Sequence, residues 1–210
     1  MALPSQFVWT RYGTEAGETI EEILDRKEIE RREAAGTFLW GIGNSVSRGI
    51  GVLLARLYGD APLVVFSPML SSPRSVDVDP PLLAHWCAAM RTDGSIWELP
   101  PGAVVTSRIA NLEKPRRRYA LVCFSDEALV ANMDGEKLTI GSLRNLESGA
   151  PVGASQVTAV VSRAGNDEDG PYIATLKAKL IPPYVVELRD PHCREPIQER
   201  QRRATQLGLL

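Results

Sequence analysis

The apolar positions in the first half of the chain predict strands that alternate with helices. Short apolar runs are typical of buried strands, whereas apolar residues spaced three and four apart mark one face of a helix. These patterns predict, in order, a strand at 7–9, a helix at 19–33, a strand at 37–40, a helix at 46–57, a strand at 63–66 and a helix from Pro80 to Met90. Trp86 lies in the apolar stripe of the last helix and is expected in the core.

From about residue 95 the pattern changes to short runs in which apolar and polar residues alternate, which predicts strands. The predicted strands lie at 104–107, 119–124, 128–131, 137–140, 156–163, 172–180 and 184–188. Many short strands separated by turn residues are typical of a small barrel or a strongly curved sheet. We therefore expect a mixed α/β fold of the α+β kind: a curved β-barrel with three flanking helices, not a doubly wound parallel sheet.

No internal repeat or low-complexity linker divides the chain, so we expect residues 1–210 to form a single domain. Residues 191–210 are rich in Arg and Gln and are expected to form a helix or a frayed tail. The helix at 19–33 is intensely charged, with Glu22–Arg26 and Glu28–Arg32 spaced as i,i+4 pairs. We expect a mostly solvated helix that covers one edge of the domain.

Composition narrows the class of protein. Hydrophobic residues make up 44% of the chain and charged residues 24%, as in ordinary globular proteins. No apolar run approaches the roughly 18 residues of a membrane span, and no secretory leader is visible, so we expect no membrane partner and a cytoplasmic location. The 3 cysteines are widely spaced, which favours reduced thiols over disulfides or a zinc site. We expect neither a metal ion nor another cofactor.

The stretch 37–45 is the most informative one. An apolar strand ending at Trp40 runs into two glycines and then into Asn44 and Ser45, which can cap the helix that follows. Trp40 offers a stacking face, the glycines let a ligand approach the backbone, and free N–H groups at a helix start attract anions. A tight turn beside a core tryptophan is the alternative interpretation.

The sequence carries weaker signals for an enzyme than for a binding site at the stretch 37–45. Residues 45–51 resemble the glycine-rich turn of short-chain dehydrogenases, but the acidic residue expected after the second strand is missing, and so is the Tyr-x-x-x-Lys pair. Cys87 lies next to His85 on the predicted helix, where the two side chains diverge, and Cys123 lies in a strand predicted to be buried. We assign no catalytic residue and favour a binding protein over an enzyme.

The order of elements resembles the PUA-like superfamily, specifically its EVE and YTH branch of modified-base readers. The matching stretches are 7–11, 40–44 and 63–67, although Trp-Thr-Arg-Tyr replaces a Lys-Ser-Glu-Pro motif and Gly43 replaces an arginine. The resemblance implies a module that takes a modified base, flipped out of nucleic acid, into an aromatic pocket. The implied base-binding residues are Trp9, Arg11, Trp40, Asn44, Ser45, Phe66 and Ser67.

Phosphate contacts are expected from a basic cluster, Arg116, Arg117 and Arg118. The expected partners are nucleic acid, with DNA carrying a modified base favoured, and an effector protein. Two alternatives remain open. One is a nucleotide- or DNA-modifying enzyme in which Ser45 and Arg48 of the glycine-rich turn hold a phosphate. The other is an interaction protein in which the tryptophans belong to the core.

Overall fold

A computed structural model describes most of the chain, and its strands form a large mixed sheet. The described residues are 3–12, 20–42, 46–57, 61–68, 82–91, 94–98, 118–129, 137–164, 172–174 and 176–196. The strands are β1 (Gln6–Tyr12), β2 (Thr37–Ile42), β3 (Leu63–Pro68), β4 (Leu82–Met90), β5 (Ile96–Trp97), β6 (Arg118–Phe124), β7 (Lys137–Thr139), β8 (Leu143–Asn145), β9 (Thr158–Arg163), β10 (Tyr172–Ala174) and β11 (Leu176–Pro196). The helices are α1 (Ile20–Glu33), α2 (Val46–Arg56) and the short 3-10 helix η3 (Ile140–Ser142).

Nine strands belong to one sheet, with the order β2-β6-β11-β3-β1-β9-β8, while β4 pairs with β11 and β5. A separate two-stranded sheet joins β10 to β7. The pair β1 and β3 is parallel, with Trp9 opposite Val65, because the connection between them crosses over through α1, β2 and α2. The other ladders between described strands are antiparallel.

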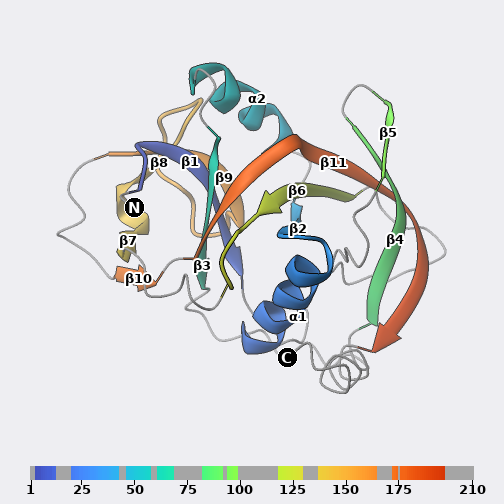
Figure 1. The fold of residues 1–210 in the computed structure, drawn as a ribbon. Coiled ribbons are helices and arrows are strands. Elements are labelled where there is room, and N and C mark those ends of the chain that lie inside the picture. Colours follow the sequence, from blue (N-terminus) through green and yellow to red (C-terminus); the bar gives the residue numbers. More distant parts are fainter. Residues whose placement is uncertain are drawn as a thin grey trace.

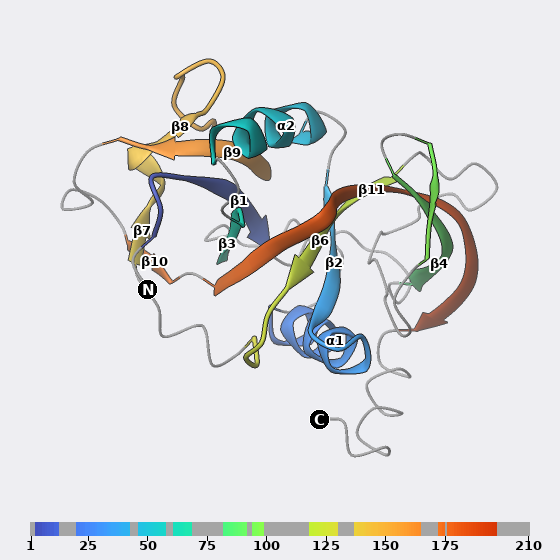
Figure 2. The ribbon, with the colours of Figure 1, turned by 45° about the horizontal axis from the view of Figure 1, so that its top comes forward.

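Strand β11 crosses the middle of the molecule and holds the sheet together (Figure 1). Its first part pairs with β3, its middle with β6, and its last part with β4. In both views β4, β5 and the end of β11 project to one side (Figure 2). Helix α2 lies over β9 and β1, and α1 lies beside β2 (Figures 1 and 2).

Alternation along the strands divides the apolar core between the two faces of the sheet. On β1, Val8 and Tyr12 belong to one cluster, whereas Phe7 and Trp9 belong to another. We call the first cluster the helix-side core, because both helices contribute to it. It includes Ile23, Leu24, Phe38, Trp40, Val46, Ile50, Leu53, Phe66, Leu121, Cys123, Leu146 and Val160. The cluster of Trp9 also contains Phe7, Val65, Leu138, Leu143 and Val161 and is called the opposite-face core.

Most predicted elements are confirmed, with shifts of a few residues at their ends. The strands at 7–9, 37–40, 63–66, 119–124, 137–140 and 156–163 and the helices at 19–33 and 46–57 are all present. The sheet is mixed and not doubly wound, as expected. The predicted strands at 172–180 and 184–188 fall into β10 and the long β11. The predicted strand at 104–107 lies outside the described residues.

The helix predicted from Pro80 to Met90 is wrong. Residues 82–90 form β4, which pairs along its length with residues 187–196 of β11. The run Leu-Leu-Ala-His-Trp-Cys-Ala-Ala-Met consists largely of helix formers, but pairing with a distant strand overrides this weak local preference. The described chain therefore has two α-helices instead of three. Over residues 191–196 the end of β11 replaces the predicted helix or frayed tail, and residues 197–210 lie outside the described part of the chain.

The predicted closed barrel is wrong as well. The sheet is open, because no ladder among the described strands joins β2 to β8 at the two ends of the strand order. The outer edge of β2 is covered by α1 instead of by another strand. The strand predicted at 128–131 is also absent over Ala128 and Leu129, which form a turn after β6. An open, curved sheet of the α+β kind replaces the barrel.

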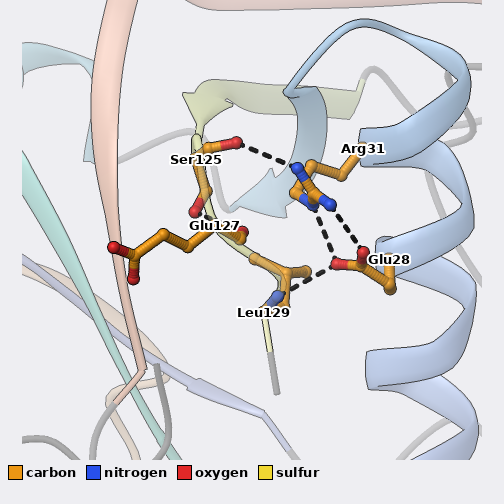
Figure 3. Close-up of polar contacts among 5 residues, drawn as sticks. All are labelled: Glu28, Arg31, Ser125, Glu127 and Leu129. Atoms are coloured by element: carbon orange, nitrogen blue, oxygen red, sulfur yellow. Dashed lines mark hydrogen bonds and ion pairs between the residues drawn. The ribbon is translucent and has the colours of Figure 1, made fainter. Parts of the chain in front are cut away.

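Helix α1 is fastened to the segment after β6 by a polar cluster (Figure 3). The guanidinium of Arg31 donates two hydrogen bonds of 2.7 and 2.8 Å to the carboxylate of Glu28, and a third of 3.3 Å to the carbonyl of Ser125. Glu28 also accepts a 2.9 Å bond from the main-chain N–H of Leu129. The bonds to Ser125 and Leu129 span 94 and 101 residues of sequence, so they fix the helix on the end of β6.

Candidate ligand-binding site

Three of the predicted base-binding residues meet on the opposite-face side of β1 and β3. The indole N–H of Trp9 donates a 3.0 Å hydrogen bond to the hydroxyl of Ser67. The guanidinium of Arg11 lies over the Trp9 ring, 4.9 Å from its centroid, and donates a 2.9 Å bond to the carbonyl of Ala154. Burial lowers the pKa of Arg11, but an arginine side chain stays protonated in proteins. Trp9 is 0% exposed, so neither of its faces is open to a ligand in this arrangement.

Two further predicted residues meet on the other face of the sheet, in the helix-side core. The Trp40 ring packs edge-on against Phe66, with centroids 4.7 Å apart, and against Tyr12 at 6.3 Å. Its indole N–H donates a 3.2 Å hydrogen bond to the hydroxyl of Thr10. Trp40 is only 9% exposed. The aromatic residues of this group therefore pack mainly against one another.

The structure thus divides the predicted aromatic pocket between two faces. Trp9 and Trp40 belong to different core clusters, because neighbouring residues of β1 point to opposite faces and Trp40 bonds to Thr10. The two tryptophans do not line one common pocket in the part of the chain that is described. Asn44, Ser45, Arg116 and Arg117 lie outside the described residues. Arg118 begins β6, and its side chain is not described.

A cavity of about 340 Å³ lies between α2 and β9, next to the helix-side core. One of its lining residues, Val46, directly follows the stretch 37–45 in the sequence. Its walls come from the first turn of α2, from the turn after β8 and from the start of β9. The lining residues are Val46, Gly49, Asn145, Leu146, Glu147, Ser148, Gln156, Thr158, Ala159 and Val160. Aliphatic and polar side chains therefore share the wall, and none of its described residues is aromatic.

Two carboxamides hold the loop that forms one wall. Gln156 Nε2 donates a 3.0 Å hydrogen bond to Asn145 Oδ1, and Asn145 Nδ2 returns a 3.3 Å bond to Gln156 Oε1. Gln156 Oε1 also accepts a 2.7 Å bond from the N–H of Gly153. Asn145 Nδ2 lies within 3.3 Å of the carbonyls of Ala150 and Pro151 as well. These bonds close residues 145–156 into a fixed loop, so the cavity wall is preformed.

A chain of hydrogen bonds connects the cavity to Trp40. Thr158, which lines the cavity, lies opposite Thr10 in the ladder of β1 and β9, and their hydroxyl oxygens are 2.8 Å apart. Thr10 in turn accepts the bond from the indole of Trp40. Trp40, although it does not line the cavity, is therefore coupled to it through two threonines.

The close approach of α2 to β9 depends on Gly49. A Cβ atom at this position would lie 3.2 Å from Cβ of Val160, which is a tight contact, and 2.9 Å from its Cγ2, which is closer than real Cβ atoms come. Val160 is β-branched and sits in a strand, so it has little freedom to move aside. Gly49 therefore sets the distance between the helix and the strand that form two walls of the cavity.

The described lining of the cavity carries little charge, which bears on the ligand that this part of the wall suits. Glu147 is the only charged side chain among the described residues that line it. Hydroxyl and carboxamide groups provide both donors and acceptors. Such a lining suits an uncharged polar group better than a phosphate. The described walls thus offer both hydrogen bonds and aliphatic contact to a small polar ligand.

The chemistry of the remaining groups is limited. Cys123 is buried in β6, and burial raises the pKa of its thiol, which keeps it protonated and unreactive. Among the described residues, no three His, Cys, Asp or Glu side chains form a group able to hold a metal ion. Neither α1 nor α2 is long and apolar enough to cross a membrane, and these are the α-helices that the described residues form.

The residues that line the cavity were not found from the sequence. Asn145, Gln156 and Thr158 lie in or beside a loop between two short strands, and no spacing marks them as a group. The one usable signal was the cluster of turn residues at Gly149, Pro151 and Gly153, which predicts a loop but no function. Comparison of the chain with protein-family models, with curated proteins and with solved structures found no match. The resemblance to modified-base readers therefore stays a prediction from short motifs.

Proposed function

We propose that the protein is a binding module that takes one nucleobase of a nucleic acid into the cavity between α2 and β9. The observation that carries this proposal is the cavity itself, with its mixed aliphatic and polar wall beside the first turn of α2. The ligand is the nucleobase predicted from the sequence, but its site is this cavity instead of the predicted aromatic pocket. Trp9, Trp40 and Phe66 support the walls from the core instead of stacking on the base.

The size of the cavity agrees with a ligand of this kind. Small-molecule sites have volumes of about 300–1,000 Å³, and 340 Å³ is at the lower end of that range. A single base or nucleoside suits such a space better than a larger ligand. A base taken out of its stack costs a few kcal/mol, which contacts in the cavity must offset.

The chemistry of the cavity wall also agrees with a nucleobase as the ligand. A base has two flat apolar faces and a polar edge, so it needs apolar contact above and below and hydrogen bonds at its rim. Val46, Leu146 and Val160 offer the apolar contact, and Gln156 and Thr158 offer polar atoms. An added methyl group on the base would gain about 0.8 kcal/mol if one of the aliphatic side chains buried it. This is a physical basis for preferring a methylated base over its plain counterpart.

The test is to fill the cavity and measure binding. Thr158→Phe places a large side chain in the cavity, whereas Thr37→Phe makes the same change at a half-buried position of β2 outside it. Labelled single-stranded and duplex dodecamers with one central base, plain or methylated, are titrated against each variant. We expect Thr158→Phe to abolish binding of every dodecamer and Thr37→Phe to bind like the unmodified protein.

The result also separates the alternatives. A Thr158→Phe variant that is folded by circular dichroism and binds dodecamers as well as the parent protein would refute the site. Turnover of a dodecamer or of a nucleotide by the parent protein would instead support the nucleotide- or DNA-modifying enzyme. Absence of binding to all dodecamers at low salt would favour the interaction protein.

A further inference from the structure

The hydrogen-bond chain from Trp40 to the cavity has a definite direction at its first link. An indole N–H can only donate, so Thr10 Oγ1 must accept the 3.2 Å bond from Trp40. Thr10 is 0% exposed, so water cannot satisfy its hydroxyl. The hydroxyl hydrogen of Thr10 needs an acceptor within the protein.

The second link follows from that need. The described structure gives the Thr10 hydroxyl one other partner, Thr158 Oγ1 at 2.8 Å. A buried donor without a partner costs more than an acceptor that leaves one of two lone pairs unused. Thr10 therefore donates to Thr158. The hydroxyl hydrogen of Thr158 then has no acceptor among the described residues, and Thr158 lines the cavity.

We infer that Thr158 determines the specificity of the cavity by donating a hydrogen bond to an acceptor on the base, either a ring nitrogen or a carbonyl oxygen. This inference rests on the proposed function. Because Thr10 donates to Thr158, one lone pair of the Thr158 oxygen is occupied, and the Thr158 hydrogen finds a partner only when the base presents an acceptor. A base that presents only an amino group at this point leaves that hydrogen without an acceptor and binds less tightly.

The direction of the chain also predicts a remote effect. Hydrogen bonds in a chain polarise one another, so a ligand that accepts from Thr158 strengthens the bonds from Thr10 and from Trp40. The indole N–H proton of Trp40 should therefore shift downfield in the NMR spectrum when the cavity is occupied. A Trp40→Phe variant identifies that resonance among those of the tryptophans.

The experiment compares Thr158→Val, which removes the hydroxyl but keeps the shape, with Thr158→Ser, which keeps the hydroxyl. Thr37→Val is the matched control in β2. The probes are single-stranded dodecamers whose central base is the one bound most tightly by the parent protein, or its analogues with C–H in place of one ring nitrogen or with one carbonyl removed. We expect Thr158→Val to bind the dodecamer with the intact base about tenfold more weakly than the parent protein does. One analogue lacks the ring nitrogen or carbonyl that accepts from Thr158, and for this analogue Thr158→Val and the parent protein should bind equally. Thr158→Ser and Thr37→Val should retain binding.

Equal binding by Thr158→Val and Thr158→Ser, or an equal loss by Thr158→Val for every analogue, would overturn the inference. An unchanged Trp40 resonance in the saturated parent protein would overturn the directed chain. These failures are distinct from failure of the proposed function. If Thr158→Phe abolishes binding while Thr158→Val does not change it, the cavity is the site and only the role of the hydroxyl is wrong. If Thr158→Phe also binds normally, both proposals are wrong.

Discussion

The carboxylate of Glu30 accepts a 2.7 Å hydrogen bond from the main-chain N–H of Leu39. Lys27, one turn earlier in α1, donates to the carbonyl of the same leucine and also bonds to Glu30 at 2.7 Å. Strand β2 lies at the end of the sheet order, so its outer edge has no neighbouring strand. Two helix side chains thus satisfy the donor and the acceptor that a strand would otherwise pair, and they protect an edge that could recruit another chain.

Removal of one charge from this pair should be strongly destabilising. Lys27 and Glu30 are buried, and burial raises the pKa of the Glu30 carboxyl against the opposing effect of Lys27. Lys27→Met removes the ion-pair partner of the buried Glu30 carboxylate, which we expect to cost about 3–5 kcal/mol in the free energy of unfolding. The double variant Lys27→Met, Glu30→Gln should be more stable than Lys27→Met alone, because the buried charge is gone. Urea unfolding measures both, and Glu33→Gln on the exposed side of α1 is the control.

Two glycines of α2 should respond in opposite ways to alanine. Gly51 has open space around its missing Cβ, so Gly51→Ala should stabilise the protein by up to about 1 kcal/mol through better helix propensity. Gly49→Ala must push α2 away from Val160, and we expect lower stability and weaker binding in the cavity. Thermal unfolding and dodecamer titration of the two variants test this, and equal effects would refute the close packing at Gly49.

The cluster around Glu28 should make stability depend on pH. Desolvation by burial raises the pKa of Glu28, but the hydrogen bonds from Arg31 and Leu129 and the charges of Arg31 and Arg32 outweigh it, so the pKa is lowered. A carboxyl with a lowered folded pKa contributes stability above its unfolded pKa of about 4.3, and that contribution is lost as pH falls through the folded value. The difference in unfolding free energy between the parent protein and Glu28→Gln should be present at pH 7 and shrink in acid. Glu127→Gln, at an exposed position nearby, is the control (Figure 3).

Ser67 should matter for stability and not for binding. Ser67→Ala leaves the buried indole N–H of Trp9 without its acceptor, at an expected cost of about 1–3 kcal/mol. Both side chains lie on the face of β1 and β3 away from Thr158, so dodecamer affinity should not change once the variant is folded. Ser155→Ala at an exposed position provides the control. Loss of affinity in a folded Ser67→Ala variant would restore the predicted role of Ser67 at the base.

The basic cluster gives a prediction about charge alone. Replacing Arg116, Arg117 and Arg118 together by alanine should weaken binding to plain and methylated dodecamers equally, because contacts to phosphate do not sense the base. The slope of log affinity against log salt should become shallower by about 2 to 3 for duplex probes. A variant that loses discrimination between bases, with an unchanged salt slope, would contradict this role.

The sequence predicted most elements because their local signals agree with their tertiary surroundings. The strand at 63–66 and the helix at 46–57 are examples, with apolar residues that point into the helix-side core. Residues 82–90 could not be predicted in this way, because a nine-residue apolar run is compatible with either structure until β11 pairs with it. The charged helix at 19–33 was expected to be mostly solvated. Lys27 and Glu30 are instead buried, since their partners are main-chain groups of Leu39 that no pattern reveals.

The candidate site was harder to predict than the fold. The stretch 37–45 directly precedes one residue of the cavity wall, because Val46 begins the helix that forms that wall. The other walls come from residues 145–160, which are about a hundred positions away and carry no motif. Thr158 contacts Thr10 only because β1 and β9 pair in this register, and the register between distant strands is set by the whole sheet.

The position of β11 has a consequence for the synthesis of the protein. Without residues 176–196, the strand order breaks into the pair β2–β6, the group β3–β1–β9–β8 and the hairpin β4–β5. A growing chain on the ribosome therefore has to keep the open edges of β3, β6 and β4 apart until residues 176–196 have emerged. Unpaired strand edges favour aggregation, so this protein should depend on chaperones, or on slow translation up to residue 196, more than a protein whose sheet is completed early.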